Sequence, residues 1–182
     1  KYYELGEITS SEKEVIKNYI KVQESINKKN SIQFLKTHSY LFNINNNGFT
    51  DLNNTLGAIY VVRDPRNVVT SFAHHSSISV DEAADQLVNL WQYGGDLNSN
   101  MVGHRTKVYI GTWNSNFNSW KSFKSSSKYL LIKYEDLIIN KEEILKKILK
   151  FIYKLKNIKF EIDKNKLKNV IESTSFETMK NL

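Results

Sequence analysis

Cysteine is absent from the sequence, and proline occurs once in 182 residues. The lack of cysteine excludes a disulfide framework, a thiolate nucleophile and a thiolate zinc site, and it favours a reducing compartment. No apolar run approaches the roughly 20 residues that a helix needs to cross a bilayer, so we expect no membrane span. Residues 1–11 also lack the apolar core of a signal peptide. These absences predict a cytoplasmic protein.

The residues that are present predict a folded domain with a basic surface. Hydrophobic residues make up 40% of the chain and aromatic residues 12%, and we expect one domain over residues 1–182. The net charge of +7 fits an anionic ligand, a nucleic acid or an acidic surface equally well. Because lysine, asparagine and isoleucine recur along the whole chain, a general compositional bias explains the charge better than a dedicated patch. We therefore predict no nucleic-acid partner.

Strand and helix patterns alternate along the chain. Apolar or β-prone runs predict strands at residues 32–36, 58–62 and 129–132. Helical patterns cover residues 11–29, 112–123 and 144–155, and further helices begin at Asp64 with Pro65 and at Ser79 with Glu82, the latter ending near Gly94. The alternation predicts an α/β fold with helices around a mostly parallel sheet, and ligands at the carboxyl ends of the strands.

The segment 59–72, IYVVRDPRNVVTSF, has the pattern of an anion site. A buried strand leads to Arg63, and Asp64 with Pro65 then begins a helix whose N-terminal N–H groups are expected to be free. Ser71 adds a hydroxyl on the same helix, so a guanidinium, a helix N-terminus and a hydroxyl would converge on one anion. The residue types alone leave a second interpretation open, in which Arg63 pairs with a local carboxylate and Ser71 is a surface residue.

RDPRNVVTS resembles the segment by which sulfotransferases hold the 3′-phosphate of 3′-phosphoadenosine 5′-phosphosulfate (PAPS), with Arg63 and Ser71 as the phosphate-binding pair. Upstream, Lys36-Thr37-His38 is similar to the Lys-Thr-His element of that family. The resemblance implies that His38 is the general base and that Lys36 balances charge around the transferring group, and an imidazole suits proton removal near neutral pH. Taken alone, both side chains are also typical of solvent-exposed positions.

Two further strings resemble the same family. Residues 129–137, YLLIKYEDL, are similar to its strand and Tyr-Glu-Asp turn, in which the tyrosine contacts the adenine, here Tyr134. Residues 174–179, TSFETM, resemble its element that lines the base, which implies adenine contacts from Thr174, Ser175 and Phe176. Each string alone is also compatible with ordinary strand-end or helix packing. The four strings occur in the family's order over most of the chain.

Two parts of the family pattern are missing from these 182 residues. No Pro-Lys-Ser-Gly-Thr-Thr-Trp loop is present for the 5′-phosphosulfate, and no Arg-Lys-Gly element closes the chain. We therefore expect a domain that is truncated at both ends, and we favour this interpretation over a degenerate relative.

The resemblance implies a three-layer α/β sandwich like that of P-loop nucleotide kinases, and sulfuryl transfer from PAPS to an acceptor hydroxyl. PAP would be the product, no metal would be needed, and the acceptor would be a small-molecule or glycan hydroxyl. A homodimer is one candidate assembly. The alternative is a degenerate or non-enzymatic module that binds PAP or a polyanion. A P-loop phosphotransferase fits less well, because no Gly-Lys-Ser/Thr loop or magnesium ligands are visible.

Overall fold

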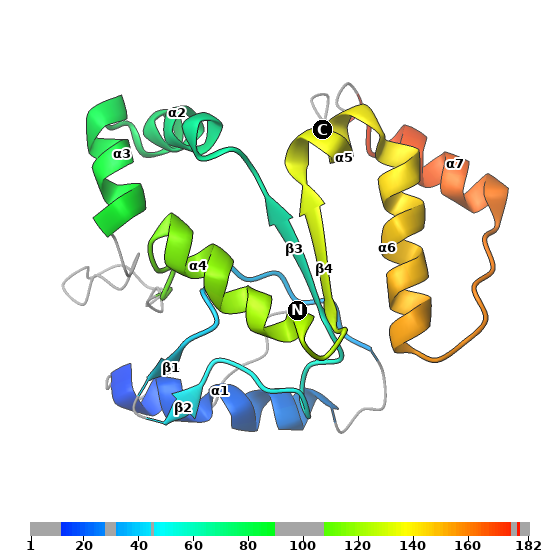
Figure 1. The fold of residues 1–182 in the computed structure, drawn as a ribbon, viewed down its shortest axis with the longest axis horizontal. Helices are drawn as coiled ribbons and strands as arrows, with labels where there is room; N and C mark the ends of the chain where they lie inside the picture. The colour runs from blue at the N-terminus through cyan, green and yellow to red at the C-terminus, as the bar shows by residue number, and fades with distance from the viewer. Residues whose placement is uncertain (1–11, 28–31, 45, 90–107, 176–177, 179–182) are drawn as a thin grey trace.

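The computed structural model describes residues 12–27, 32–44, 46–89, 108–175 and 178. These residues form an α/β fold in which helices flank a parallel pair of strands (Figure 1). In chain order the elements are α1 (Glu12–Asn27), β1 (Asn43–Ile44), β2 (Asn47–Gly48), β3 (Ala58–Val62), α2 (Pro65–Ser76), α3 (Val80–Asn89), α4 (Trp113–Trp120), the 3₁₀ helix η1 (Lys121–Lys124), β4 (Tyr129–Lys133), α5 (Tyr134–Ile139), α6 (Lys141–Leu155) and α7 (Lys164–Ser173). The predicted α/β class and its parallel sheet are confirmed.

Strands β3 and β4 run side by side and parallel, with Ala58 opposite Tyr129 and Val62 opposite Lys133. In Figure 1, α4 lies to the left of this pair and α6 to its right, which gives the helix, sheet and helix layers. The second ladder is a short antiparallel pairing of β1 with β2. Because the carboxyl ends of β3 and β4 reach the same edge, α2 and α5 begin next to each other.

The strand predicted at residues 32–36 is not formed. These residues have no ladder partner, and the side chains of Phe34 and Leu35 are 73% and 64% exposed. A strand is stable only when its backbone groups are paired across a ladder, and the ladder described for β3 goes to β4. The β-prone composition of the segment therefore produces an extended chain that is not part of the sheet.

Side-chain caps begin the helices near the strand ends. The Asp64 carboxylate accepts a hydrogen bond from Arg66 N at 2.9 Å, and Pro65 is the first residue of α2, both as predicted. Before α3, Ser79 Oγ accepts from Glu82 N at 3.1 Å, which confirms the predicted cap. The predicted end of that helix near Gly94 lies outside the described residues.

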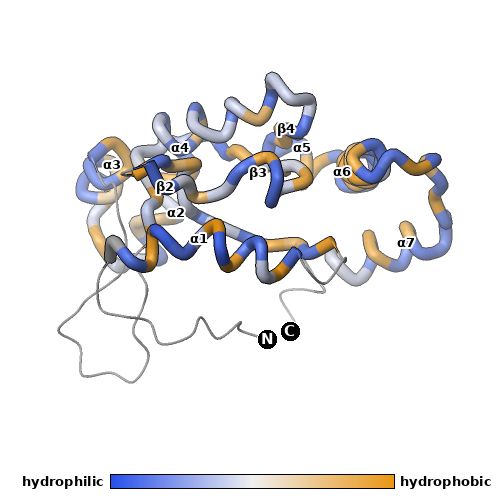
Figure 2. Tube along the Cα trace, turned by 90° about the horizontal axis from the view of Figure 1, so that it is seen from below, coloured by the Kyte–Doolittle hydropathy of each residue, from blue (hydrophilic) through white to orange (hydrophobic). Residues whose placement is uncertain are grey.

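The N-terminal helix α1 packs on an aromatic cluster rather than on the sheet. Ile16 of α1, Phe42 and Tyr109 are buried together, and the rings of Phe42 and Tyr109 meet edge to face at 5.2 Å. Polar residues alternate with apolar ones along α1 (Figure 2), as the sequence pattern predicts. Residues 11, 28 and 29 of the predicted helix lie outside the described residues.

Candidate functional site

A cavity of about 1100 Å³ lies beside β3 and the beginning of α2. Its polar lining includes Lys36, His38 and Arg63. Much of its apolar lining comes from residues before β1, from β3 and from α6: Ile32, Phe34, Leu35, Ile59, Val61, Phe151 and Leu155. The structure thus places a lysine, a histidine and an arginine from two distant segments on one cavity.

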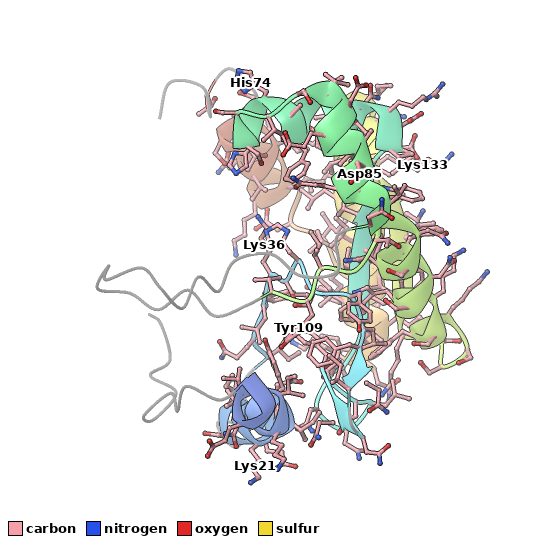
Figure 3. All side chains as sticks on the ribbon, turned by 90° about the vertical axis from the view of Figure 1, so that its left-hand side faces the viewer. Lys21, Lys36, His74, Asp85, Tyr109 and Lys133 are labelled. Carbon is pink, nitrogen blue, oxygen red and sulfur yellow. The ribbon has the colours of Figure 1, made fainter. Side chains whose placement is uncertain are left out.

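Lys36 and His38 belong to an extended segment that α4 holds in place. Asn116 Nδ2 donates to the carbonyl oxygen of His38 at 3.0 Å, and the indole N–H of Trp120 donates to that of Ser39 at 3.0 Å. The side chains of Lys36 and His38 remain exposed. In Figure 3, Lys36 lies between α2 above and α1 below. The backbone of this segment is therefore fixed while its basic side chains stay accessible.

Arg63 follows β3 directly and lies against an aromatic ring. Its Cζ is 4.8 Å from the centre of the Tyr134 ring, within the range of a cation–π contact. The Arg63 Nε group is buried and finds no hydrogen-bond partner among the described residues. The alternative in which Arg63 pairs with a local carboxylate is not what the described residues show.

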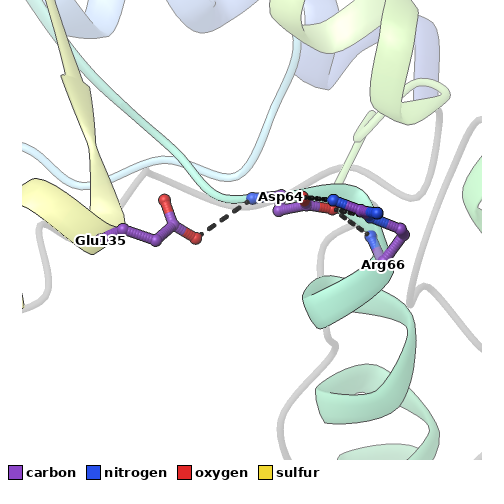
Figure 4. Close-up of polar contacts among 3 residues, drawn as sticks. All are labelled: Asp64, Arg66 and Glu135. Atoms are coloured by element: carbon purple, nitrogen blue, oxygen red, sulfur yellow. Dashed lines mark hydrogen bonds and ion pairs between the residues drawn. The ribbon is translucent and has the colours of Figure 1, made fainter.

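The expectation of free N–H groups at the beginning of α2 is wrong. The Asp64 carboxylate takes the N–H of Arg66, the carbonyl oxygen of Asp64 accepts from Asn67 N and Val68 N, and Pro65 has no N–H. The Arg66 side chain also pairs with Asp64 at 2.6 Å (Figure 4). Since the first turn satisfies its own donors, the N-terminus of α2 offers no free N–H group beside Arg63.

Hydrogen bonds from Arg66 lower the pKa of the Asp64 carboxyl to about 2. On its other side, the backbone N–H of Asp64 lies 3.4 Å from Glu135 Oε1 (Figure 4). The carboxylates of Asp64, which follows Arg63, and of Glu135, at the end of the neighbouring strand, are thus engaged with other donors. No ion pair between Arg63 and a carboxylate is found among the described residues.

Among the described residues, the remaining predicted site residues are not part of the cavity lining. Ser71 is exposed on α2. At the end of α7, Thr174 Oγ1 donates to Val170 O at 2.6 Å, and the Ser175 hydroxyl contacts that of Thr178 at 2.7 Å. Phe176 lies outside the described residues. Lys36, His38 and Arg63 thus line one cavity and Tyr134 contacts Arg63, while Ser71, Thr174 and Ser175 are not among the described lining residues.

Two side chains of α4 that the sequence analysis did not include in the site also support it. Asn116 and Trp120 lie one turn apart on α4, and both bind backbone carbonyls next to His38. The helix was predicted, but its aromatic stripe of Trp113, Phe117 and Trp120 indicates a core face. An amide placed four residues before a buried tryptophan was the available signal, since both then lie on one helix face.

The described residues contain neither a metal-binding cluster nor a membrane-spanning helix. In this part of the chain, no three histidine, cysteine, aspartate or glutamate side chains are grouped as a metal site. No helix among the described residues is long and apolar enough to cross a membrane.

A family model described as the sulfotransferase domain matches residues 3–182. The chain belongs to this family. It is 24% identical to the luciferin sulfotransferase of Photinus pyralis, over 82% of this chain and 36% of that relative. It is 27% identical to the amine sulfotransferase of Oryctolagus cuniculus, over 70% of this chain and 38% of that relative. This sulfotransferase domain thus spans little more than a third of the length of these curated relatives.

The fold of this sulfotransferase domain is similar to a crystal structure of a mouse sulfotransferase complexed with PAP. The TM-score is 0.51 at 22% identity, over 69% of this chain and 40% of the mouse chain. The predicted family and the predicted sulfotransferase fold are therefore confirmed.

Proposed function

We propose that this sulfotransferase domain belongs to an enzyme that transfers a sulfuryl group from PAPS to an acceptor hydroxyl. The observation that carries the proposal is the common cavity of Lys36, His38 and Arg63 beside the carboxyl end of β3. Family membership supports the reaction class. The mouse sulfotransferase is complexed with PAP, which is what remains of PAPS after transfer, and this supports the choice of donor.

In the proposed reaction His38 accepts the proton of the acceptor hydroxyl as the new oxygen–sulfur bond forms. PAPS supplies the sulfuryl group when bound, and its sulfur–oxygen bond to the 5′-phosphate breaks. Lys36 places a positive charge on the same cavity, where it offsets negative charge that develops during transfer. The proposal includes no metal, because a sulfate group carries less charge to neutralise than a triphosphate does.

The donor set of the site fits a phosphate group. A guanidinium offers several N–H donors in one plane, and Arg63 has no described carboxylate partner. Within the proposal, Arg63 binds the 3′-phosphate with Ser71, and Tyr134, Thr174, Ser175 and Phe176 frame the adenine. Ser71, Thr174 and Ser175 are not among the described lining residues, so within the proposal they contribute to the nucleotide site from outside this lining.

We further propose that residues 1–182 act as a single domain, in the cytoplasm, on a small-molecule or glycan hydroxyl. The named substrates of the two relatives, luciferin and amines, favour small molecules. A homodimer remains the assembly to test by light scattering.

The test combines nucleotide binding with transfer. PAP affinity is measured by calorimetry, and transfer is measured with sulfur-labelled PAPS and a panel of phenols, alcohols and sugars. We expect His38→Gln to lower the transfer rate about 10²- to 10⁴-fold with PAP affinity kept, and Arg63→Met to weaken PAP binding. Lys147→Met removes an exposed lysine of α6 outside the cavity lining and serves as the matched control.

Each result decides between the alternatives. Unchanged transfer in His38→Gln would overturn the role of that residue. PAP binding without transfer to any acceptor would favour a nucleotide-binding module. Absence of PAP binding, together with steeply salt-dependent binding of a polyanion such as heparin, would reject the proposed enzyme in favour of a polyanion-binding module.

A further inference from the structure

Arg63 and Tyr134 occupy equivalent places on neighbouring strands. Val62, the last residue of β3, is opposite Lys133, the last residue of β4, so the residues that follow them are neighbours at the sheet edge. The distance of 4.8 Å from Arg63 Cζ to the centre of the Tyr134 ring is a consequence of this register. The contact therefore depends on the sheet and not on a loop conformation.

The described residues show this ring contact of the guanidinium but no hydrogen bond or ion pair from the Arg63 side chain. Arg63 Nε is buried without a hydrogen-bond partner among the described residues, although a buried donor is normally paired. The carboxylate of Glu135 lies near Asp64 N instead, and that of Asp64 pairs with Arg66. An aromatic face can orient a guanidinium without neutralising its charge, whereas a carboxylate would do both.

Tyr134 is also absent from the described lining of the cavity, while Arg63 is part of it. The tyrosine is thus placed to influence a ligand through the arginine. Tyr134 is 37% exposed and is not enclosed in the core, so packing of the sheet alone gives no reason for an aromatic side chain here.

We propose that Tyr134 is a positioning residue, which holds the Arg63 guanidinium by a cation–π contact so that its charge remains available to a phosphate group in the cavity. This inference rests on the proposed function and goes beyond an adenine contact. It makes Tyr134 important for recognition of the 3′-phosphate rather than only of the base.

Two nucleotides that differ only in the 3′-phosphate separate the two roles. Calorimetric dissociation constants for PAP and for AMP are compared in the unaltered chain, Tyr134→Phe and Tyr134→Leu. We expect Tyr134→Leu to weaken PAP binding about 3- to 30-fold and to change AMP binding less than about twofold, because the strength of a cation–π contact corresponds to such factors. Tyr134→Phe keeps the ring and should bind PAP like the unaltered chain.

Equal losses of PAP and AMP affinity in Tyr134→Leu would overturn the inference, because the ring would then act on the nucleoside. Equal PAP losses in Tyr134→Phe and Tyr134→Leu would also overturn it, since the hydroxyl and not the ring would matter. Combining Tyr134→Leu with Arg63→Met should cost no more PAP affinity than Arg63→Met alone. Additive losses would contradict a role exerted through Arg63.

A ligand-independent measurement keeps the inference separate from the proposed function. If the unaltered chain binds no PAP, the proposed function fails, and the contact is tested by the rate at which phenylglyoxal modifies Arg63, followed by peptide mass spectrometry. We expect a several-fold faster modification of Arg63 in Tyr134→Leu but not in Tyr134→Phe, with exposed Arg66 as the internal reference. Equal Arg63 rates in all three proteins would overturn the positioning role.

Discussion

Asn116 connects three segments through one amide side chain. Its Nδ2 donates to the carbonyl oxygens of His38 at 3.0 Å and Ile110 at 2.7 Å, and its Oδ1 accepts from the Tyr60 hydroxyl at 2.9 Å. Tyr60 belongs to β3, so the amide joins the sheet to the segment that carries His38. The position of the proposed base therefore depends on an amide that also lines the cavity but has no chemical role in the proposed reaction.

We expect Asn116→Ala to lower the free energy of unfolding by about 1–3 kcal/mol, because partly buried carbonyls and a phenol lose their partners. The rate of sulfuryl transfer should fall together with stability, as the His38 backbone loosens. Urea unfolding measures the change in stability, and the transfer assay with sulfur-labelled PAPS measures the change in rate. Asn118→Ala removes an exposed amide from the same helix and is the matched control. Equal stability of the two variants would contradict the connecting role of Asn116.

Asp64 provides the second prediction at the scale of one residue. Its pKa is lowered to about 2 from 3.8 by the hydrogen bonds from Arg66, so the folded state favours the ionised form. The contribution of this carboxylate is present above its unfolded pKa and is lost as the pH falls from about 4 to about 2. We expect the thermal midpoints of the unaltered chain and Asp64→Asn to differ at pH 6 and to converge by pH 2.

Asp64→Asn is the informative variant because asparagine keeps the N-cap of α2 but has no charge. A constant difference in thermal midpoint from pH 6 to pH 2 would show that the Asp64–Arg66 pair does not titrate as described. The same measurement on Asp163→Asn, which removes the capping carboxylate of α7, reports the effect of a comparable cap elsewhere.

At the scale of the elements, the beginning of β3 has no space for a side chain at Gly57. An added Cβ would lie 2.5 Å from Leu155 Cδ1 of α6 and 3.1 Å from the carbonyl oxygen of Lys128. The leucine can rotate away, but the backbone oxygen before β4 cannot move without disturbing the strand pair. A side chain at this position would therefore have to displace Leu155 of α6 and crowd the carbonyl oxygen of Lys128.

We expect Gly57→Ala to destabilise the fold by about 1–3 kcal/mol through overpacking between α6 and the sheet. Gly48→Ala is the control, since the nearest atom to its added Cβ is 3.4 Å away, an ordinary contact. Both are measured by urea unfolding, and adding Leu155→Ala to Gly57→Ala removes one of the two clashes. A Gly57→Ala chain as stable as Gly48→Ala would contradict the close approach of α6.

Local signals predicted the helix beginnings more reliably than the strands. Asp64 with Pro65, and Ser79 with Glu82, begin helices where the sequence indicates, because a cap is formed by residues adjacent in the chain. The strand expected at residues 32–36 failed, because a strand needs a ladder partner that its own sequence does not encode. The expectation of free N–H groups at the beginning of α2 was wrong because of a local contact, in which the adjacent Asp64 accepts a hydrogen bond from the helix.

For the whole molecule, the expectation that ligands bind at the carboxyl ends of parallel strands predicted the part of the site that directly follows β3 and β4. Arg63 and Tyr134 follow adjacent parallel strands, so their proximity follows from a correct strand assignment. The place of His38 on the same cavity depends on Asn116 and Trp120, which bind its segment from almost 80 residues away along the chain. The spacing of Asn116 and Trp120 puts both on one helix face but does not identify their distant partners, and family resemblance was needed to select His38.

The tyrosines provide a prediction for the whole fold. Burial raises the pKa of Tyr19, Tyr40 and Tyr129, and burial followed by the neighbouring Tyr129 raises the pKa of Tyr60 to about 12. A phenol whose pKa is raised in the folded state keeps its proton to a higher pH there than in the unfolded state. Stability is therefore present below the unfolded pKa of about 10 and is lost as the pH rises towards 12.

We expect the free energy of unfolding, measured in urea, to fall between pH 10 and pH 12 as phenolate absorbance at 295 nm appears. Tyr60→Phe should be less stable at pH 9, because it lacks the hydrogen bond to Asn116, yet it should lose less stability above pH 10. Lysine deprotonation in the same range affects both proteins alike and cancels in the comparison. Parallel stability curves would mean that Tyr60 titrates as an ordinary phenol, and that the contact between β3 and α4 is open to water.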